Sequence, residues 1–188
     1  MKISTRKMTI VAMMAAISVI LVYLIHTPLI PGLAFLEYDP ADIPIFITTF
    51  MFGPVAGLIL TVVVSVIQGL TVSAGSGIIG IVMHIVATGS FVILAGNLYK
   101  RMPSIKGAAL SLGAGVLLWI AVMALWNLVL TPIFMGIPRE VLLSQYYGGI
   151  VLFNVIKAGI NSVCTFLLYK VLGPFIQKQV RVFAKTER

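Results

Sequence analysis

The fold is decided by residues 43–71, which read IPIFITTFMFGPVAGLILTVVVSVIQGLT and contain no charged side chain. A helix needs about 20 apolar residues to cross the hydrocarbon of a bilayer. This stretch is therefore long for one crossing and short for two. Gly53-Pro54 interrupts it, and a proline removes a helical hydrogen bond and restricts the residue before it. The stretch predicts either one long helix or two short helices that meet at this pair.

The composition of the whole chain indicates a membrane protein. Of its 188 residues, 60% are hydrophobic and 10% are charged, and the mean hydropathy is +1.13. Soluble domains carry about 25% charged residues, so these charges are too few to cover a water-exposed surface. Soluble enzymes, nucleic-acid binders and disordered tails are poor interpretations despite the net charge of +8. The single cysteine, Cys164, excludes an intrachain disulfide.

We therefore expect one domain, residues 1–188, that is an all-α integral membrane protein with its transmembrane helices in one bundle. The positive-inside rule decides how often residues 43–71 cross. A turn at Gly53-Pro54 places eleven of the 13 basic residues and both termini on the cytoplasmic side, and four of the five acids outside. A single crossing would put the 100–106 loop and the basic tail outside. The predicted six spans are residues 8–25, 42–53, 54–71, 78–99, 107–130 and 150–172.

The acidic residues cluster in the first outer loop, where Glu37, Asp39 and Asp42 surround Pro40. Asp42 is expected to cap the short second helix. Every acid is expected in a loop or tail, which disfavours an ion-coupled carrier because such carriers usually hold an acid within the membrane.

Five polar side chains fall in the outer third of the predicted spans: Gln68, His84, Asn127, Asn154 and Lys157. Polar groups at membrane depth usually face a bundle interior or a cavity. Asn154, Lys157 and Asn161 also share one helical face, because they are spaced i, i+3, i+7. These positions predict a pocket that opens outward.

Three of these residues have alternative interpretations. Gln68 either sits at the membrane interface or contacts the ligand. Lys157 either reaches outward to loop carbonyls and water or donates to a bound ligand. His84 either packs with a hydrogen-bonded partner or contacts the ligand. Phe35 and Tyr38 lie in the loop that is expected to fold over the pocket as a lid.

Several motifs are absent from the sequence. There is no GxxxxGK[ST] phosphate loop and no HExxH metal motif, and we expect no metal site, no cofactor and no ATPase activity of its own. On the first helix, Ala12 and Ala16 are small residues one turn apart, a spacing that lets another helix approach closely.

The chain resembles a known family, the substrate-binding S components of energy-coupling factor (ECF) vitamin transporters, and in particular the riboflavin-specific S components. The resemblance rests on AMMAA at residues 12–16, FLEYDPADIP at 35–44, FGPVAG at 52–57, Trp126-Asn127, and NVIK at 154–157. It covers essentially the whole chain.

This resemblance implies a riboflavin pocket in which Asn127, Asn154 and Lys157 bind the flavin ring, with Phe35 and Leu36 of the first loop against it. We include Gln68 and His84 as further candidate binding residues. It also implies partners, namely a transmembrane coupling subunit that docks on Ala12 and Ala16 and two ATPase subunits that use ATP. The expected location is a prokaryotic plasma membrane.

The resulting hypothesis is a non-enzymatic, high-affinity riboflavin-binding subunit of an ATP-driven importer. One alternative is an S component for another vitamin such as biotin, whose carboxylate Lys157 could pair. Alternatives of other classes are a small membrane enzyme that uses His84 or Lys157, and an assembly factor without a small-molecule site.

Overall fold

The computed structural model describes residues 5–186, and side chains through residue 178. The described chain is helical apart from its loops and two strands of two residues each, so the prediction of an all-α protein is confirmed. Its elements are α1 (Thr5–Leu24), β1 (Thr27–Pro28), β2 (Glu37–Tyr38), α2 (Asp42–Phe52), α3 (Pro54–Leu70), the 3₁₀ turn η1 (Ala74–Ser76), α4 (Gly77–Arg101), α5 (Ile105–Met135), α6 (Arg139–Val141), the π-helical turn η2 (Leu142–Tyr146) and α7 (Tyr147–Thr186).

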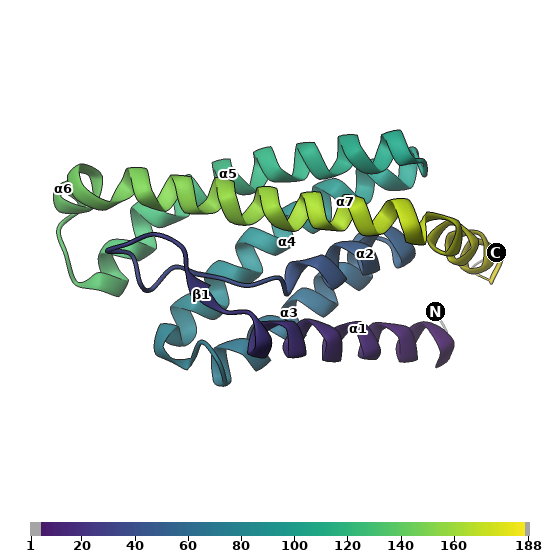
Figure 1. The fold of residues 1–188 in the computed structure, drawn as a ribbon, viewed down its shortest axis with the longest axis horizontal. Helices are drawn as coiled ribbons and strands as arrows, with labels where there is room; N and C mark the ends of the chain where they lie inside the picture. Colours follow the sequence, from purple (N-terminus) through teal and green to yellow (C-terminus); the bar gives the residue numbers. More distant parts are fainter. Residues whose placement is uncertain (1–4, 187–188) are drawn as a thin grey trace.

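The long helices run roughly side by side along the longest axis of the molecule (Figure 1). Helix α4 packs between α3 and α5, α7 packs on α5 and α2, and α1 covers α2 and α3. Helix α1 begins and α7 ends at the same end of the bundle, which we call the terminal end; α6 lies at the opposite end, the loop end (Figure 1).

The chain changes helix at Gly53. This glycine has φ 86°, a left-handed conformation that suits a residue without Cβ, and Pro54 then occupies the first turn of α3, where no helical hydrogen bond is lost. Close packing continues one turn later, because a side chain at Gly57 would overlap Thr49 and Val92. Residues 43–71 thus form two helices rather than one.

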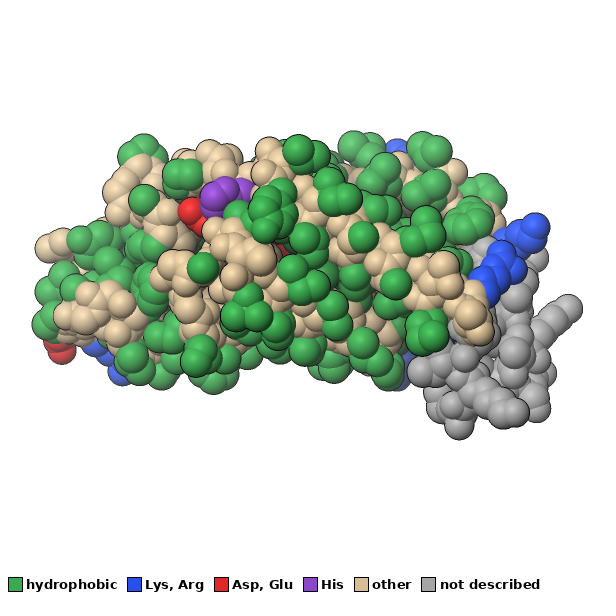
Figure 2. Space-filling model, turned by 90° about the horizontal axis from the view of Figure 1, so that it is seen from below, with side chains coloured by type: hydrophobic (Ala, Val, Ile, Leu, Met, Phe, Trp, Pro, Cys, Tyr) green, Lys and Arg blue, Asp and Glu red, His purple; other side chains and the backbone are tan. Residues whose placement is uncertain are grey.

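Four of the described helices, α1, α4, α5 and α7, are long and apolar enough to cross a membrane, whereas α2 and α3 are apolar but shorter. Hydrophobic side chains are spread along the whole face seen in Figure 2, with few charged side chains among them. The six-span count and the cytoplasmic placement of the termini remain predictions. Two helices extend past their predicted spans, since α5 reaches Met135 and α7 continues through Pro174 to Thr186.

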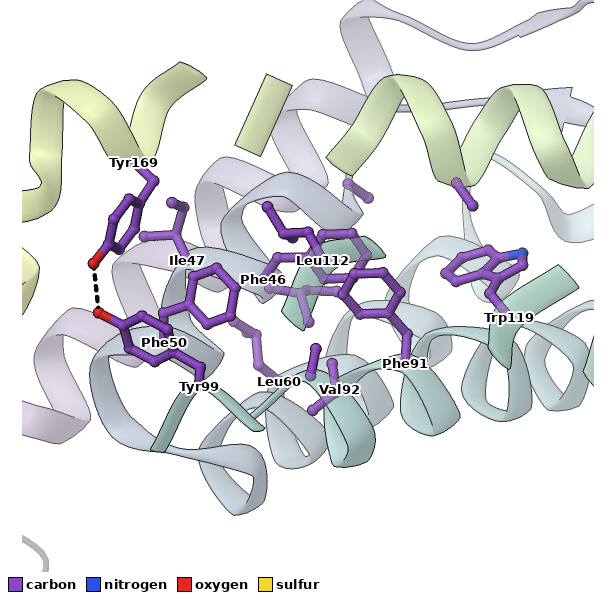
Figure 3. Close-up of a cluster of buried hydrophobic side chains, with 14 of the residues drawn as sticks. Phe46, Ile47, Phe50, Leu60, Phe91, Val92, Tyr99, Leu112, Trp119 and Tyr169 are labelled. Carbon is purple, nitrogen blue, oxygen red and sulfur yellow. Dashed lines mark hydrogen bonds between the residues drawn. The ribbon is translucent and has the colours of Figure 1, made fainter. Parts of the chain in front are cut away.

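The interior toward the terminal end is filled by aromatic side chains (Figure 3). The rings of Phe46 and Phe91 stack with centroids 3.8 Å apart, and Phe50 lies against Tyr99 at 4.4 Å. The hydroxyl groups of Tyr99 and Tyr169 share a hydrogen bond of 2.7 Å between α4 and α7. We call these five residues the aromatic core.

The segment between α1 and α2 folds back over the bundle. Strands β1 and β2 pair antiparallel, with Thr27 opposite Tyr38 and Pro28 opposite Glu37. Its end is held against α1, because the Ser18 hydroxyl donates to the Ala41 carbonyl at 2.9 Å. This loop therefore brings residues 35–39 to the helices that follow it in the sequence.

Candidate functional site

A cavity of about 910 Å³, its open mouth included, lies toward the loop end. It is lined by residues of α3, α4, α5, α7 and the loop before α2. All seven of the predicted binding residues line it: Phe35, Leu36, Gln68, His84, Asn127, Asn154 and Lys157. Whether they contact a ligand remains a prediction.

One wall carries two buried amides. Asn127 donates to the Met123 carbonyl at 2.7 Å and accepts from the Thr131 hydroxyl at 2.7 Å. Asn154 donates to the carbonyl one turn before it and accepts from the Trp119 indole N–H at 3.0 Å. Each amide nitrogen still has one hydrogen free to donate, and each amide oxygen has one lone pair free to accept. The wall can therefore donate to and accept from a flat polar ring.

An ion pair also lines the cavity, about one turn along α7 from Asn154. Lys157 Nζ lies 2.8 Å from Asp39 Oδ2, and Gln68 Nε2 donates to the same oxygen at 3.1 Å. Asp39 is only 1% exposed. Neither interpretation of Lys157 foresaw this arrangement, in which the ammonium is paired inside the protein and still has hydrogens to donate.

A second carboxylate near the cavity, that of Asp42, is also buried. Asp42 is 0% exposed. It accepts from Thr88 at 2.7 Å and from Asn161 at 3.0 Å, and His84 Nε2 lies 3.1 Å away. The histidine therefore has the packing partner of its first interpretation while also lining the cavity.

Two expectations about Asp42 are wrong. The helix cap is Ala41, with no side-chain cap hydrogen bond, because the Asp42 carboxylate turns inward to α4 and α7. Asp42 also lies within the first turn of α2 rather than in a loop, so a buried acid is present in a helix of the bundle. The sequence could not show this, since the residues that bind Asp42 come from distant helices.

Asn161 links the Asp42 carboxylate to the main chain of Asp39. Its amide donates to the Asp39 carbonyl and to Asp42, and its oxygen accepts from the Tyr38 hydroxyl at 3.0 Å. Burial raises the pKa of Tyr38 above its usual value. We call Asp39, Asp42, His84, Lys157 and Asn161 the cavity network.

Sequence reasoning missed two residues of the site, Asp39 and Trp119. Asp39 was visible in the acidic cluster, but its partners Gln68 and Lys157 are 29 and 118 residues away in the sequence. Trp119 had a weak signal, an indole N–H near the middle of a predicted span, because a buried indole usually needs an acceptor.

No group of three or more His, Cys, Asp or Glu side chains suited to a metal is found among the described residues. The predicted docking residues Ala12 and Ala16 are both exposed on α1, away from the cavity. The loop residue Phe35 lies 5.7 Å from the Phe134 ring, so an aromatic contact links the loop to α5 beside the cavity.

Comparison with known proteins gives the family. The profile of a family described as "ECF transporter, substrate-specific component" matches residues 6–169. The chain belongs to the ECF transporter S components. It is thus a membrane protein and a transporter component rather than an enzyme, and the alternative of a membrane enzyme that uses His84 or Lys157 is wrong.

Individual proteins show a likeness over nearly the whole chain. The riboflavin transporter FmnP of Bacillus subtilis is 29% identical, covering 93% of this chain and 95% of its own length. The riboflavin transporter RibU of Lactococcus lactis is 32% identical, covering 96% of this chain and 88% of its own length. A solved structure, described as that of the S component of a bacterial ECF transporter, matches with a TM-score of 0.77 and 29% identity, covering 91% of this chain and 97% of its own.

Proposed function

We propose that the chain is the riboflavin-binding subunit of an ATP-driven importer. The observation that carries the proposal is the cavity, which gathers the amides of Asn127 and Asn154 and the ammonium of Lys157 in a chain similar throughout to riboflavin transporters. The pyrimidine end of the flavin ring offers carbonyl oxygens and an N–H. These groups are complementary to amides that donate and accept and to an ammonium that donates.

The apolar part of the cavity suits the rest of a flat aromatic ligand. Phe35, Trp119, Phe134 and Phe153 line it, and aromatic side chains bind ring faces and edges well. Binding pockets of this kind combine apolar walls with a few polar groups that fix orientation.

The ion pair favours riboflavin over biotin. Lys157 already has a carboxylate partner in Asp39. A biotin carboxylate at the same place would put two anions on one ammonium, and a like charge nearby disfavours an ionised carboxylate. The uncharged flavin ring brings no such repulsion, so the cavity suits it better.

Transport requires partners in this proposal. The chain uses no cofactor of its own, and ATP is used by two ATPase subunits joined through a transmembrane coupling subunit. The exposed Ala12 and Ala16 of α1 form the docking face for that coupling subunit. The protein lies in a prokaryotic plasma membrane, crosses it six times and opens its cavity to the outside.

The test is the visible absorption spectrum of the detergent-purified protein, followed by titration with riboflavin. Flavin bands, or quenching of riboflavin fluorescence at one-to-one stoichiometry, support the proposal. A colourless protein that leaves riboflavin fluorescence unchanged refutes it. Displacement of the bound ligand by excess biotin but not by riboflavin would favour the biotin alternative.

A further inference from the structure

One oxygen of Asp39 orients two cavity side chains from different helices. Lys157 of α7 and Gln68 of α3 both donate to Oδ2, at 2.8 and 3.1 Å. The rest of Asp39 is held as well, because Oδ1 accepts from the Ala41 N–H at 3.1 Å and its carbonyl accepts from Asn161 at 3.2 Å. The position of this oxygen is therefore fixed by the backbone and by α7.

The contact with Asp39 also determines which way the Gln68 amide points. An ionised carboxylate only accepts hydrogen bonds, so the amide nitrogen must face Asp39. Its second contact is the Ser73 hydroxyl at 3.4 Å. The amide oxygen is consequently turned away from the carboxylate and is free to accept.

That oxygen is buried and has no partner. Among the described side chains, four buried polar atoms lack a hydrogen bond, on Thr48, Gln68, Ser111 and Ser162. Of these four residues, Gln68 alone lines the cavity. Buried acceptors are nearly always satisfied in native proteins, so a small rotation of the Gln68 side chain toward a ligand donor would satisfy this one.

We propose that Asp39 is a positioning residue that holds Lys157 and Gln68 as a donor–acceptor pair, and that Gln68 Oε1 accepts a hydrogen bond from the ligand. The ligand group this pair recognises carries an N–H or O–H donor beside an acceptor. The inference rests on the proposed function. Riboflavin has two such groups, the imide edge of its ring and the neighbouring hydroxyls of its ribityl chain.

The first experiment compares wild type and Gln68→Met with three probes: riboflavin, lumiflavin, which lacks the hydroxylated chain, and N3-methylriboflavin, which lacks the imide N–H. Methionine keeps the size of glutamine and removes its acceptor. We expect the riboflavin Kd to rise about tenfold, the scale of one hydrogen bond. Thr48→Val, which removes an unpartnered hydroxyl away from the cavity, is the control and leaves the Kd unchanged.

The probes identify the donor. If the imide donates, Gln68→Met weakens lumiflavin binding as much as riboflavin binding and has no effect on N3-methylriboflavin. If a ribityl hydroxyl donates, the effect disappears for lumiflavin and persists for N3-methylriboflavin. Either pattern supports the inference. An equal loss for all three probes, or no loss for any, overturns it.

The second experiment tests the role of Asp39 by a double-mutant cycle. Asp39→Asn allows the Gln68 amide to turn over, so adding Gln68→Met to it should cost no further affinity. A full additional tenfold loss in that background overturns the positioning role. If Asp39→Asn does not purify as a folded protein, Asp39→Glu replaces it in the cycle, because it keeps the charge and displaces the oxygen by one methylene.

Failure of the inference can be told from failure of the proposed function. A wild-type protein that binds no flavin overturns both. A wild type that binds riboflavin tightly, with a Kd that Gln68→Met does not change, overturns this inference alone.

Discussion

Toward the terminal end, the interior of the bundle is filled by the aromatic core, whereas toward the loop end it is hollow and edged by the cavity network. Both regions are buried, and helices α2, α4 and α7 contribute to each. In the aromatic core the side chains contact one another directly. In the cavity network the contacts are hydrogen bonds and ion pairs that leave space beside them.

This difference indicates that the same helices provide close packing toward one end and an open cavity toward the other. In a membrane, lipid is as apolar as leucine, so helices associate through close packing and hydrogen bonds rather than through the hydrophobic effect. The aromatic core provides the packing that fixes the helices. The cavity network can then keep charged groups inside the bundle without filling the space that a ligand needs.

The largest expected effect comes from breaking the ion pair of the cavity network. Lys157→Met leaves Asp39 buried without its cation, which costs about 3–5 kcal/mol of stability. It also removes a charged donor to the ligand, which weakens riboflavin binding by about 1.5–3 kcal/mol. Thermal unfolding in detergent and fluorescence titration measure the two effects. Lys106→Met, at an exposed position, is the control.

Combining Lys157→Met with Asp39→Asn sharpens this test. The double variant carries no unpaired charge at the site, so we expect it to be more stable than Lys157→Met while its riboflavin affinity stays low. An unchanged unfolding temperature and Kd for Lys157→Met would show that the lysine contributes neither to stability nor to riboflavin binding.

Truncation of a side chain in the aromatic core should affect stability and not ligand affinity. Phe50→Ala removes a ring that contacts both Tyr99 and Tyr169, which costs about 3 kcal/mol. The folded fraction should bind riboflavin with unchanged affinity, because Phe50 does not line the cavity. Phe175→Ala removes an exposed ring of α7 and serves as the matched control. A large change in Kd for Phe50→Ala would contradict the division between the regions.

A smaller effect is expected at the single hydrogen bond of the aromatic core. Tyr169→Phe leaves the buried Tyr99 hydroxyl without a partner and should cost about 1 kcal/mol of stability. Adding Tyr99→Phe removes the orphaned hydroxyl and should recover part of the loss. Tyr23→Phe, on the exposed surface of α1, should change nothing. A further loss in the double variant would show that the hydroxyls act separately.

The smallest effect on the isolated protein is expected outside both regions. Ala12→Leu on the exposed face of α1 should leave stability and riboflavin affinity unchanged, because it touches neither the core nor the cavity. It should reduce co-purification with the coupling subunit by preventing close helix approach. Met13→Leu, at an exposed neighbouring position that is already large, is the control. Equal co-purification of both variants would refute the proposed docking face.

The sequence by itself determined the class of fold and seven of the residues that line the cavity. Long apolar runs predict helices because an uninterrupted apolar segment has few other stable states in lipid. Gly53 and Pro54 mark a helix boundary because their backbone restrictions are local. Polar residues at membrane depth, such as Asn127 and Asn154, indicate an interior site because they are costly elsewhere.

Only the tertiary structure decided the partners of the buried charges. Lys157 meets Asp39 across 118 residues of sequence, and His84 meets Asp42 across 42. No local pattern encodes such pairs, so the sequence suggested a helix cap for Asp42 and, for Lys157, loop carbonyls or a ligand rather than a carboxylate. The orientation of the Gln68 amide was equally hidden, because it depends on a carboxylate that the folding of the first loop brings to α3 and α7.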